Sequence, residues 1–502
     1  MKKPLIRRSQ RDTIHRKGEH GVTMVLVAIS MVAIISIAAL SIDVITLYLA
    51  REEAQRSADS AALAAAKIIS VSGLTGDPTN SAGNWQKICG PDNGVNGLAT
   101  RVAKSVAGQD TVGGIVATSI NVGYSAGSGG TMGAGTSDCS TLTGTAFGVN
   151  PIVTVQLTRA SLPTFFSRIW GNTGAQVTAT ATAEAYNPSN SANSGNQTSG
   201  TMIPVQPRCI KPWAVPNQDP QNPASCTPTG ATACKPLINV TDGSIMNPGM
   251  TLNGSTGPGT VGETFWLDPD CRNGNRANCQ LHGGGAPVQP EANYPTGAHG
   301  TPNLLYVPAQ VGTPVLAVPS CTSGEQYEEA IEGCDQPTNY ACGMPGNVNV
   351  IDTTINPVAG TTAGVSCLIN QSDTADFTNA SGQDYLTTSG TFGAPNAYPY
   401  QMMAGSANPT GLKDVPISIS SSIVSLPIYD NNNGPGKTLA SNTQNPVTFV
   451  GFLQVFINAV DQNGSMKVTV LNVAGCGNGS AGAPATSEIG NSPVPVRLIT
   501  PP

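Results

Sequence analysis

The first pattern along the chain is an uninterrupted apolar run near its beginning. Residues 22–42 hold twenty-one positions without a charge. At 1.5 Å per helical residue this run spans about 30 Å, the thickness of a bilayer core. Residues 47–69 follow without Gly or Pro and are dominated by Ala, the strongest helix former. The pattern predicts one helix that crosses a membrane once and continues outward unbroken.

Small side chains recur along one side of the Ala-rich part of this helix. They are three and four residues apart, the spacing that places residues on one face. Such a stripe can let another helix approach closely, or it can pack on the chain's own next domain, and both interpretations stay open. Glu52 precedes Arg56 by four residues, the favourable order for a helical ion pair. The stripe consists of Ala54, Ala58, Ala61, Ala62 and Ala65.

Basic residues are concentrated before the apolar run. Seven of the 24 Lys and Arg residues lie in the first twenty positions, against Asp12 and Glu19. The positive-inside rule therefore predicts a single-pass, N-in membrane protein whose remaining chain is delivered outside. The alternative is a cleaved secretory signal peptide. Its apolar core would usually be about 7–15 residues long and would end in an A-x-A-like site, which does not follow cleanly here.

The next hundred residues have the pattern of a small α/β module. Residues 95–106 have the spacing of a short amphipathic helix, and residues 116–124 alternate like a strand. Residues 152–157 and 175–186 predict two further strands. Residues 187–201 are a polar Asn/Ser/Gly run of the flexible kind, where we expect a domain boundary.

The last hundred residues contain the clearest strands. Residues 415–429 and 447–460 are β-branched and aromatic, and 466–473 follow a turn that contains Asn463-Gly464. This pair marks a hairpin. Both alternating faces of 447–460 are apolar, which is typical of a central strand covered on both sides. We expect a second core here, built as a β-sandwich.

Composition and charge indicate a loop-rich chain and exclude one class of function. Of 502 residues only 11% are charged, while Gly and Pro number 57 and 39. Much of the chain is therefore expected in turns and irregular loops. The net charge of −6 excludes a nucleic-acid-binding body, because it supplies no positive field for phosphates.

The cysteines indicate an oxidising compartment. Twelve Cys is an even number in a loop-rich chain, and nine of them lie between 204 and 399, where cross-links are expected to substitute for a core. No C-x₂-C occurs, so zinc ligation is not expected. Three pairs share one spacing and are candidates for locally bridged loops: Cys226/Cys234, Cys271/Cys279 and Cys334/Cys342.

The N-terminal residues carry a resemblance to a known family. The positions that carry it are Gly21 before the apolar span, then Asp43, Tyr48, Arg51, Gln55 and the run 58–66 (ADSAALAAA). Together they resemble the N-terminal segment of TadG-like Flp pilus-assembly proteins. A looser similarity extends through 152–157, 162–171 and 177–183. The candidate interaction residues of this stalk are Asp43, Tyr48, Arg51, Gln55, Ala58, Asp59, Ala61 and Ala62.

The resemblance implies a role and a location. It implies a structural component of tight-adherence (Tad) pilus assembly in the bacterial inner membrane, with the bulk of the chain periplasmic or extracellular. It also implies protein–protein contact with other Tad/Flp pilus-assembly or pilin proteins, without catalysis or cofactor.

A processed pseudopilin or minor pilin is the alternative within this class. Such subunits are cut just after a Gly and carry Glu at the fifth position of the mature chain. After Gly21 the fifth position is Leu26, and after Gly18 it is Thr23. An uncleaved anchor is therefore favoured.

A secreted hydrolase is the remote alternative. Gly123–Gly127 satisfies the G-x-S-x-G pattern with Ser125 as the nucleophile, but the Gly/Ser run that follows does not favour the required helix. A triad would have to recruit His282 or His299. We expect no catalytic residues.

Three further short segments resemble ligand-binding motifs but lack a required residue, so we expect them to be turns. Residues 434–438 lack the first Gly of a phosphate-binding loop, since Asn431 stands there. Asp268-Pro269-Asp270 and 430–433 lack the Gly and Glu of a calcium loop. The D-x-S-x-S metal site of some relatives is also absent. We therefore expect no metal site.

The expected fold class is α+β, with a long transmembrane helix, a small α/β module and a disulfide-rich, predominantly β extracytoplasmic region. The expected divisions are a cytoplasmic basic tail (1–20), the transmembrane helix and Ala-rich stalk (21–70), the α/β module (71–186), a linker (187–203), a Cys/Pro/Gly-rich loop region (204–400) and a C-terminal β domain (401–502).

Overall fold

A computed structural model provides the description of the chain. It confirms a mixed α+β fold that begins with a long apolar helix. The described residues are 19–80, 83, 85–92, 95–126, 135–142, 147–148, 150–164, 166–167, 171, 174–187, 207–220, 235–241, 243–251, 259–270, 303–312, 321, 324–334, 340, 349–376, 381–388, 400–417, 419–431, 439–476 and 492–499.

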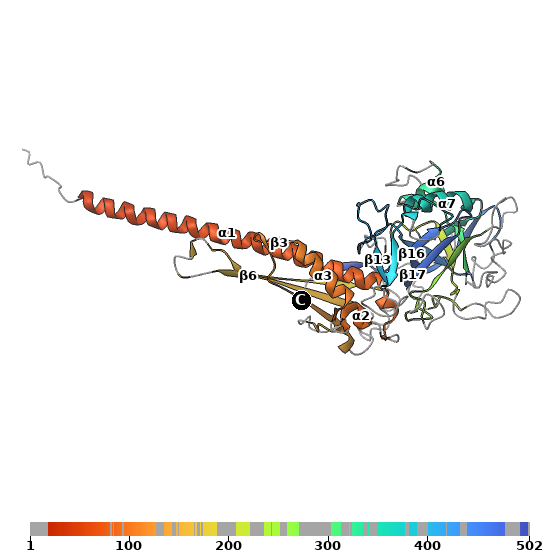
Figure 1. Cartoon of the computed structure of the whole chain (residues 1–502), viewed down its shortest axis with the longest axis horizontal. Coiled ribbons are helices and arrows are strands. Elements are labelled where there is room, and N and C mark those ends of the chain that lie inside the picture. The colour runs from red at the N-terminus through yellow and green to blue at the C-terminus, as the bar shows by residue number, and fades with distance from the viewer. Residues whose placement is uncertain are drawn as a thin grey trace, which may run out of the picture.

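Helix α1 (Glu19–Val71) is continuous over 53 residues. This confirms that the apolar run and the Ala-rich segment form one element. Figure 1 shows its first part projecting beyond the rest of the molecule and its second part lying along a sheet. The helix ends at Val71, and Gly73 turns the chain with a φ of 68°, the left-handed conformation that glycine adopts without strain.

The sheet beside α1 has four antiparallel strands in the order β18-β7-β6-β5. Helix α3 (Leu98–Gln109) packs along α1 and confirms the predicted amphipathic helix. Alternation along β6 puts Val153, Val155 and Leu157 into the core against α1. The strands are β5 (Ser119–Ala126), β6 (Pro151–Leu162), β7 (Ala175–Ala185) and β18 (Val496–Ile499).

Short helices and strands connect α1 with the four-stranded sheet. Trp85 stacks edge-on against Phe147 with ring centroids 5.1 Å apart, and a disulfide joins Cys89 to Cys139. These contacts hold the connections between α1 and the sheet. The elements are η1 (Leu74–Gly76), α2 (Trp85–Cys89), β1 (Pro91–Asp92), β2 (Val95–Asn96), β3 (Thr111–Val112), β4 (Ile115–Val116) and η2 (Cys139–Thr141).

The second core is a closed barrel in the order β10-β8-β14-β16-β17-β9. The expected β-sandwich is therefore wrong. Closure depends on the parallel pairing of β9 with β10, and it removes exposed strand edges. The strands are β8 (Trp213–Pro216), β9 (Thr264–Pro269), β10 (Asn303–Pro308), β14 (Ile423–Tyr429), β16 (Phe449–Val460) and β17 (Met466–Gly475).

The predicted hairpin is confirmed in β16 and β17. The two strands are antiparallel, and eleven of the twelve residues of β16 are buried, as expected for a central strand. In the turn, the Asp461 carboxylate accepts the N–H groups of Asn463 (2.8 Å) and Ser465 (2.9 Å). Gly464 supplies a φ of 78°.

Two helices and two small sheets accompany the barrel. The helices contribute Tyr327, Ile331 and Val365 to the barrel's main core cluster, and Ile369 directly after the second helix also belongs to it. They are α6 (Gln326–Glu332) and α7 (Pro357–Leu368), and the strand pairs are β11 (Asn349–Asp352) with β15 (Gln444–Val447) and β12 (Tyr385–Thr388) with β13 (Tyr400–Met403).

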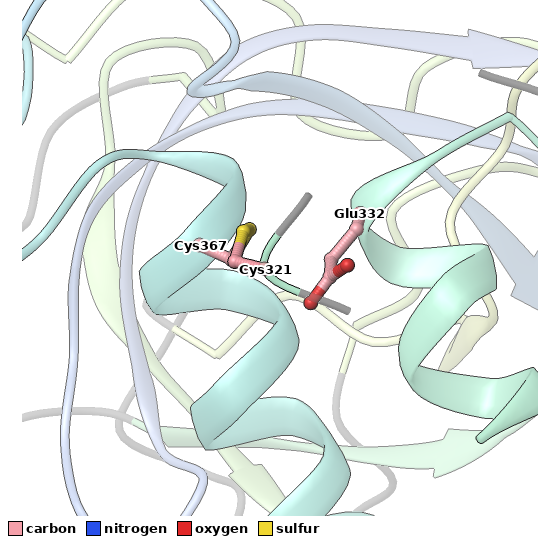
Figure 2. A group of neighbouring side chains, drawn as sticks. All are labelled: Cys321, Glu332 and Cys367. Atoms are coloured by element: carbon pink, nitrogen blue, oxygen red, sulfur yellow. A yellow bond between two sulfur atoms is a disulfide. The ribbon is translucent and has the colours of Figure 1, made fainter. Parts of the chain in front are cut away.

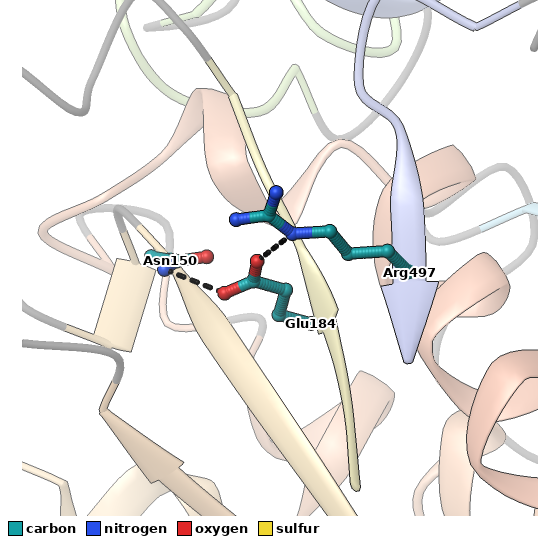
Figure 3. Close-up of polar contacts among 3 residues, drawn as sticks. All are labelled: Asn150, Glu184 and Arg497. Atoms are coloured by element: carbon teal, nitrogen blue, oxygen red, sulfur yellow. Dashed lines mark hydrogen bonds and ion pairs between the residues drawn. The ribbon is translucent and has the colours of Figure 1, made fainter. Parts of the chain in front are cut away.

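The chain returns from the barrel to the first sheet. Strand β18 pairs with β7, so the barrel is inserted between neighbouring strands of the N-terminal sheet. Figure 3 shows the contact that fixes this register: Glu184 accepts hydrogen bonds from Asn150 (3.0 Å) and from the Arg497 guanidinium. Barrel strands therefore come from both expected regions, 204–400 and 401–502. The last strand, β18, lies within the expected C-terminal division 401–502 but belongs to the N-terminal sheet.

Disulfides cross the barrel region at long range. Cys209 bonds to Cys334 across 125 residues, so the expected local pair of Cys334 with Cys342 is wrong. Cys321 bonds to Cys367, and Cys476 is also disulfide-bonded. Among the cysteines that are described, none is free. The other candidates, Cys226, Cys234, Cys271, Cys279 and Cys342, lie outside the described residues.

Candidate functional site

The projecting part of α1 is an apolar cylinder open to its surroundings. An eighteen-residue stretch has a mean hydropathy of 2.7 and is only 6% buried by the rest of the chain. Its three serines do not present free hydroxyls, because each donates to a backbone carbonyl one turn earlier: Ser30 to Val27, Ser36 to Val32 and Ser41 to Ile37. Such a surface is suited to hydrocarbon rather than to water.

Asp43 marks the end of the apolar stretch. Its side chain is 3% exposed, although its neighbours on the helix face outward. One carboxylate oxygen accepts the backbone N–H groups of Phe166 (3.0 Å) and Ser167 (2.7 Å), which lie between β6 and β7. A buried charge is tolerable when donors satisfy it. Asp43 thus fastens the tip of the sheet to α1 where the apolar stretch ends.

The alanine stripe is covered by the chain's own sheet. Ala58, Ala61 and Ala62 are each 0% exposed and belong to the core shared with β6 and β7. Of the two interpretations of the stripe, packing on the chain's own next domain is the one observed. These three residues are therefore unavailable to a partner, and their small size serves close packing of α1 on the sheet.

The remaining candidate residues lie on the uncovered side of α1. Tyr48, Arg51 and Gln55 are exposed and are three and four residues apart, so they share a face. We call these three residues the outer face. Gln55 donates to the half-buried Asp59 (2.8 Å) and to the Thr180 carbonyl (3.1 Å), which ties the edge of this face to β7.

Two charged contacts border the outer face. The predicted pair of Glu52 with Arg56 forms at 3.7 Å, with the Arg56 side chain 82% and the Glu52 side chain 46% exposed. Glu53 accepts the backbone N–H of Gly113 at 2.7 Å, in the turn between β3 and β4. Sequence reasoning missed Glu53, because a carboxylate in a helix gives no signal of a turn sixty positions later.

The last turn of α1 is seated on the barrel. Asn472 of β17 donates to the Ser70 carbonyl and, at 2.7 Å, to Gln454 of β16. The Ser70 hydroxyl donates to the Val494 carbonyl at 2.6 Å. Val71 completes a cluster with Met402, Phe456 and Leu471. The helix therefore connects its apolar stretch, the sheet and the barrel in one rigid element.

The residues of the short catalytic and metal-binding motifs are scattered over the fold. Ser125 lies within strand β5 opposite Ile152. Asp268 and Asp270, at the end of β9, are buried. His282, His299 and the residues 434–438 lie outside the described part of the chain, as do two of the four residues 430–433.

One side-chain group has the composition of a metal site. Cys321, Cys367 and the buried Glu332 lie within 4.8 Å of one another, from the segment before α6, from α7 and from α6 (Figure 2). The two sulfurs are bonded to each other and offer no thiolates. Glu332 instead influences Lys211: burial lowers the pKa of that amine to about 7, and the carboxylate of Glu332 partly opposes this shift.

Comparison with known protein families gives a match that falls on α1. Residues 21–67 match the family model Tad, described as putative Flp pilus-assembly TadE/G-like. We refer to residues 21–67 as the Tad segment because of this match. No curated protein matches the chain, and no solved structure matches it.

The Tad segment coincides with structural features already described. It begins at the apolar stretch, includes Asp43 and the outer face, and ends at residue 67, just before the last turn of α1 that contacts the barrel. The match supports a role related to Flp/Tad pilus assembly, and it points to a structural rather than an enzymatic protein.

Proposed function

We propose that this protein is a membrane-anchored structural component of Flp/Tad pilus assembly. The apolar stretch of α1 crosses the inner membrane once with the N-terminus in the cytoplasm, and the sheet and barrel stand outside. The observation that carries the proposal is the coincidence of the Tad match with a helix that its own chain leaves uncovered for an apolar length of about 30 Å.

The orientation rests on charge and on disulfides. The basic residues before the apolar stretch favour the cytoplasm. The bonds Cys89–Cys139, Cys209–Cys334 and Cys321–Cys367 all lie on the other side of it, and disulfides persist in oxidising compartments. Both arguments favour an outward-facing body.

The partner-binding surface in this proposal is the outer face. Tyr48 is 64% exposed directly beyond the apolar stretch, and Arg51 lies one turn further out. A Tyr and an Arg combine apolar area with hydrogen bonding, and both are enriched where proteins meet. Another Tad or Flp pilus-assembly protein in the same membrane is the partner we propose.

Anchoring is tested by adding charge to the helix. In the double variant Ile34→Lys, Ile37→Lys, each Lys costs about 2.5–3.5 kcal/mol near the bilayer centre. We expect the variant to appear in the carbonate-soluble fraction while the wild type stays in the membrane pellet. The control Ile419→Lys changes a residue of the body that is 81% exposed and leaves the protein in the pellet. A double variant that stays in the membrane contradicts the anchor.

The same preparation distinguishes an anchor from a processed subunit. We expect intact mass and N-terminal sequencing of the extracted protein to give the full-length chain, and thiol labelling without reduction to find no reactive cysteine. A new N-terminus at Val22 would make the protein a pilin-like subunit. Extensive free thiols would contradict the outward-facing body.

Partner contact is tested by photo-crosslinking. A benzophenone amino acid replaces Tyr48 in one variant and Ile419 in the control. We expect the Tyr48 probe to capture a Tad or Flp protein in cells that express the assembly system, and the control to capture none. Equal capture from both positions, or from neither, contradicts the outer face as the binding surface.

A further inference from the structure

Two carboxylates are buried together where the barrel faces the end of α1. Asp219 follows β8 and is 0% exposed, and Glu263 directly precedes β9 and is 1% exposed. They are 44 positions apart in the sequence and lie within hydrogen-bonding reach of each other. Two ionised carboxylates in such a place repel one another, and both lose hydration.

Glu263 lacks the compensation that buried carboxylates usually have. Both of its carboxylate oxygens are shielded from solvent, and neither accepts a hydrogen bond from an N–H or hydroxyl group in the described part of the chain. Burial, and then the charge of Asp219, raise the pKa of Glu263 to about 10. The Asp219 carboxylate receives long contacts from the Thr260 hydroxyl (3.3 Å) and the Asn247 amide (3.4 Å).

Most of the atoms gathered here are hard oxygen ligands, and the exception is the Asn247 amide nitrogen that faces Asp219. Two carboxylates supply up to four oxygens, Thr260 supplies a hydroxyl, and Asn247 supplies an amide whose oxygen and nitrogen exchange places by rotation of the side chain. Carboxylate, hydroxyl and amide oxygens are the ligands that Ca²⁺ prefers. Asn247 is half-buried, whereas Asp219, Thr260 and Glu263 are each at most 1% exposed.

We propose that Asp219 and Glu263, with Thr260 and Asn247, bind one hard divalent cation, for which Ca²⁺ is the best match. A cation between the two carboxylates removes their repulsion and supplies the partner that Glu263 lacks. No motif in the sequence predicts this site, because its four residues are spread over 44 positions of the one connection between β8 and β9 and meet only when that connection folds.

The place of the site gives the cation a structural effect. Val261 occupies the position into which a side chain at Gly76 would project, 2.7 Å from an ideal Cβ there. Gly249 donates its N–H to the Gly76 carbonyl at 2.8 Å. Residues 247–251 and 259–263 therefore carry three of the four proposed ligands and also the contacts with the segment that follows α1. A bound cation would stiffen the junction between the N-terminal module and the barrel, independently of the proposed assembly function.

The test compares the full-length protein in detergent with its Glu263→Gln variant. Gln has nearly the same shape as Glu and removes the buried charge. The matched control is Glu329→Gln, which removes the same charge from a half-buried position on α6. Equilibrium dialysis against radioactive Ca²⁺ measures the number of ions bound, and thermal unfolding in Ca²⁺, in Mg²⁺ and in chelator measures their effect.

We expect the wild type and Glu329→Gln to bind one more Ca²⁺ ion than Glu263→Gln. Their melting temperature should rise with Ca²⁺ in a saturable way, and that of Glu263→Gln should not. Should Glu263→Gln fail to fold, Asp219→Asn replaces it in both measurements. Equal Ca²⁺ binding by all variants overturns the proposal, and so does a wild type whose melting temperature is the same in Ca²⁺ and in chelator. In either case the two carboxyl groups share a proton instead of a cation.

Discussion

The two cores of this protein are built from side chains of different size. Where α1 meets the first sheet, the buried residues are mostly Ala, both on the helix and on β7, where Ala179, Ala181 and Ala183 face it. The barrel instead buries Val, Leu, Ile and aromatic residues, with Trp213 the largest fully buried side chain. The first core is thin and lets two backbones approach closely, whereas the second is thick and fills a closed interior.

This difference decides which substitutions each core tolerates. A large side chain in the barrel contributes much apolar area, so its removal leaves a cavity. An Ala between a helix and a sheet contributes one methyl group but leaves no room, so its enlargement separates the two elements. Truncation should therefore damage the barrel most, and enlargement should damage the N-terminal module most.

The largest effect is expected from truncation in the barrel. Leu453 of β16 is fully buried in the main barrel cluster, and Leu453→Ala should lower the free energy of unfolding by about 2–5 kcal/mol. Denaturant unfolding of the detergent-extracted protein measures this loss. Ile419→Ala, at an 81% exposed position, is the control and should stay within about 0.5 kcal/mol of the wild type. Equal losses for both variants would contradict a packed barrel interior.

The next effect is enlargement beneath α1. Ala62 is 0% exposed, so Ala62→Leu should cost about 1–3 kcal/mol by overpacking, although Leu is a good helix former. Ser60→Leu, an exposed position on the same helix, is the matched control and should be close to neutral. Protease sensitivity of the N-terminal module and its unfolding curve both report the change. If Ala62→Leu proves neutral, α1 is not tightly seated on the sheet.

A smaller effect is expected from pH, through the buried acid of the barrel. The pKa of Glu263 is raised from 4.5 to about 10, so above pH 4.5 the unfolded chain releases a proton that the folded chain keeps. In chelator, stability should therefore fall as pH rises from 5 to 6.5, by roughly 1 kcal/mol per pH unit. Glu263→Gln should lack this slope.

The pH window avoids the opposite effect of Lys211. The pKa of this amine is lowered to about 7, so its protonation costs stability below that value, and the loss is regained only as pH rises from about 7 toward 10.5. Thermal unfolding at pH 5, 5.75 and 6.5 isolates Glu263. A wild type and a Glu263→Gln variant with parallel pH profiles would show that this carboxyl group is not buried as described.

The smallest effect is expected on the exposed side of α1. The Glu52–Arg56 pair at 3.7 Å is open to solvent, and such helical pairs contribute about 0.3–0.5 kcal/mol. A double-mutant cycle of Glu52→Gln and Arg56→Gln should give a coupling energy of this size that decreases in high salt. A coupling energy above about 1 kcal/mol would mean that the pair is shielded by a partner.

The sequence was sufficient for elements whose pattern is local. The unbroken helix, the amphipathic α3, three of the four strands of the first sheet and the β16–β17 hairpin follow from periodicity, Ala content and the Asn463-Gly464 turn. Strand β18 was not predicted. The barrel did not follow from it. Strands β8, β9 and β10 have four to six residues each in Pro- and Gly-rich surroundings, and closure depends on pairings between segments far apart in the chain.

For the candidate site too, local spacing could be predicted from the sequence, whereas contacts between distant residues could not. Spacing correctly placed the alanines on one face of α1 but could not say what covers that face. The disulfide of Cys334 was misassigned because equal spacing suggested a local loop, whereas the fold brings Cys209 beside it. The contacts of Asp43 with Phe166 and Ser167, and of Asp219 with Glu263, join residues with no shared motif.

The return of the chain to the first sheet has a mechanical consequence. Because the barrel is inserted between β7 and β18, two covalent connections join it to neighbouring strands of one sheet. A pull on the barrel is divided between them, and the load passes in shear through β7 to α1 and so toward the apolar stretch. A single break in either connection leaves the barrel tethered by the other.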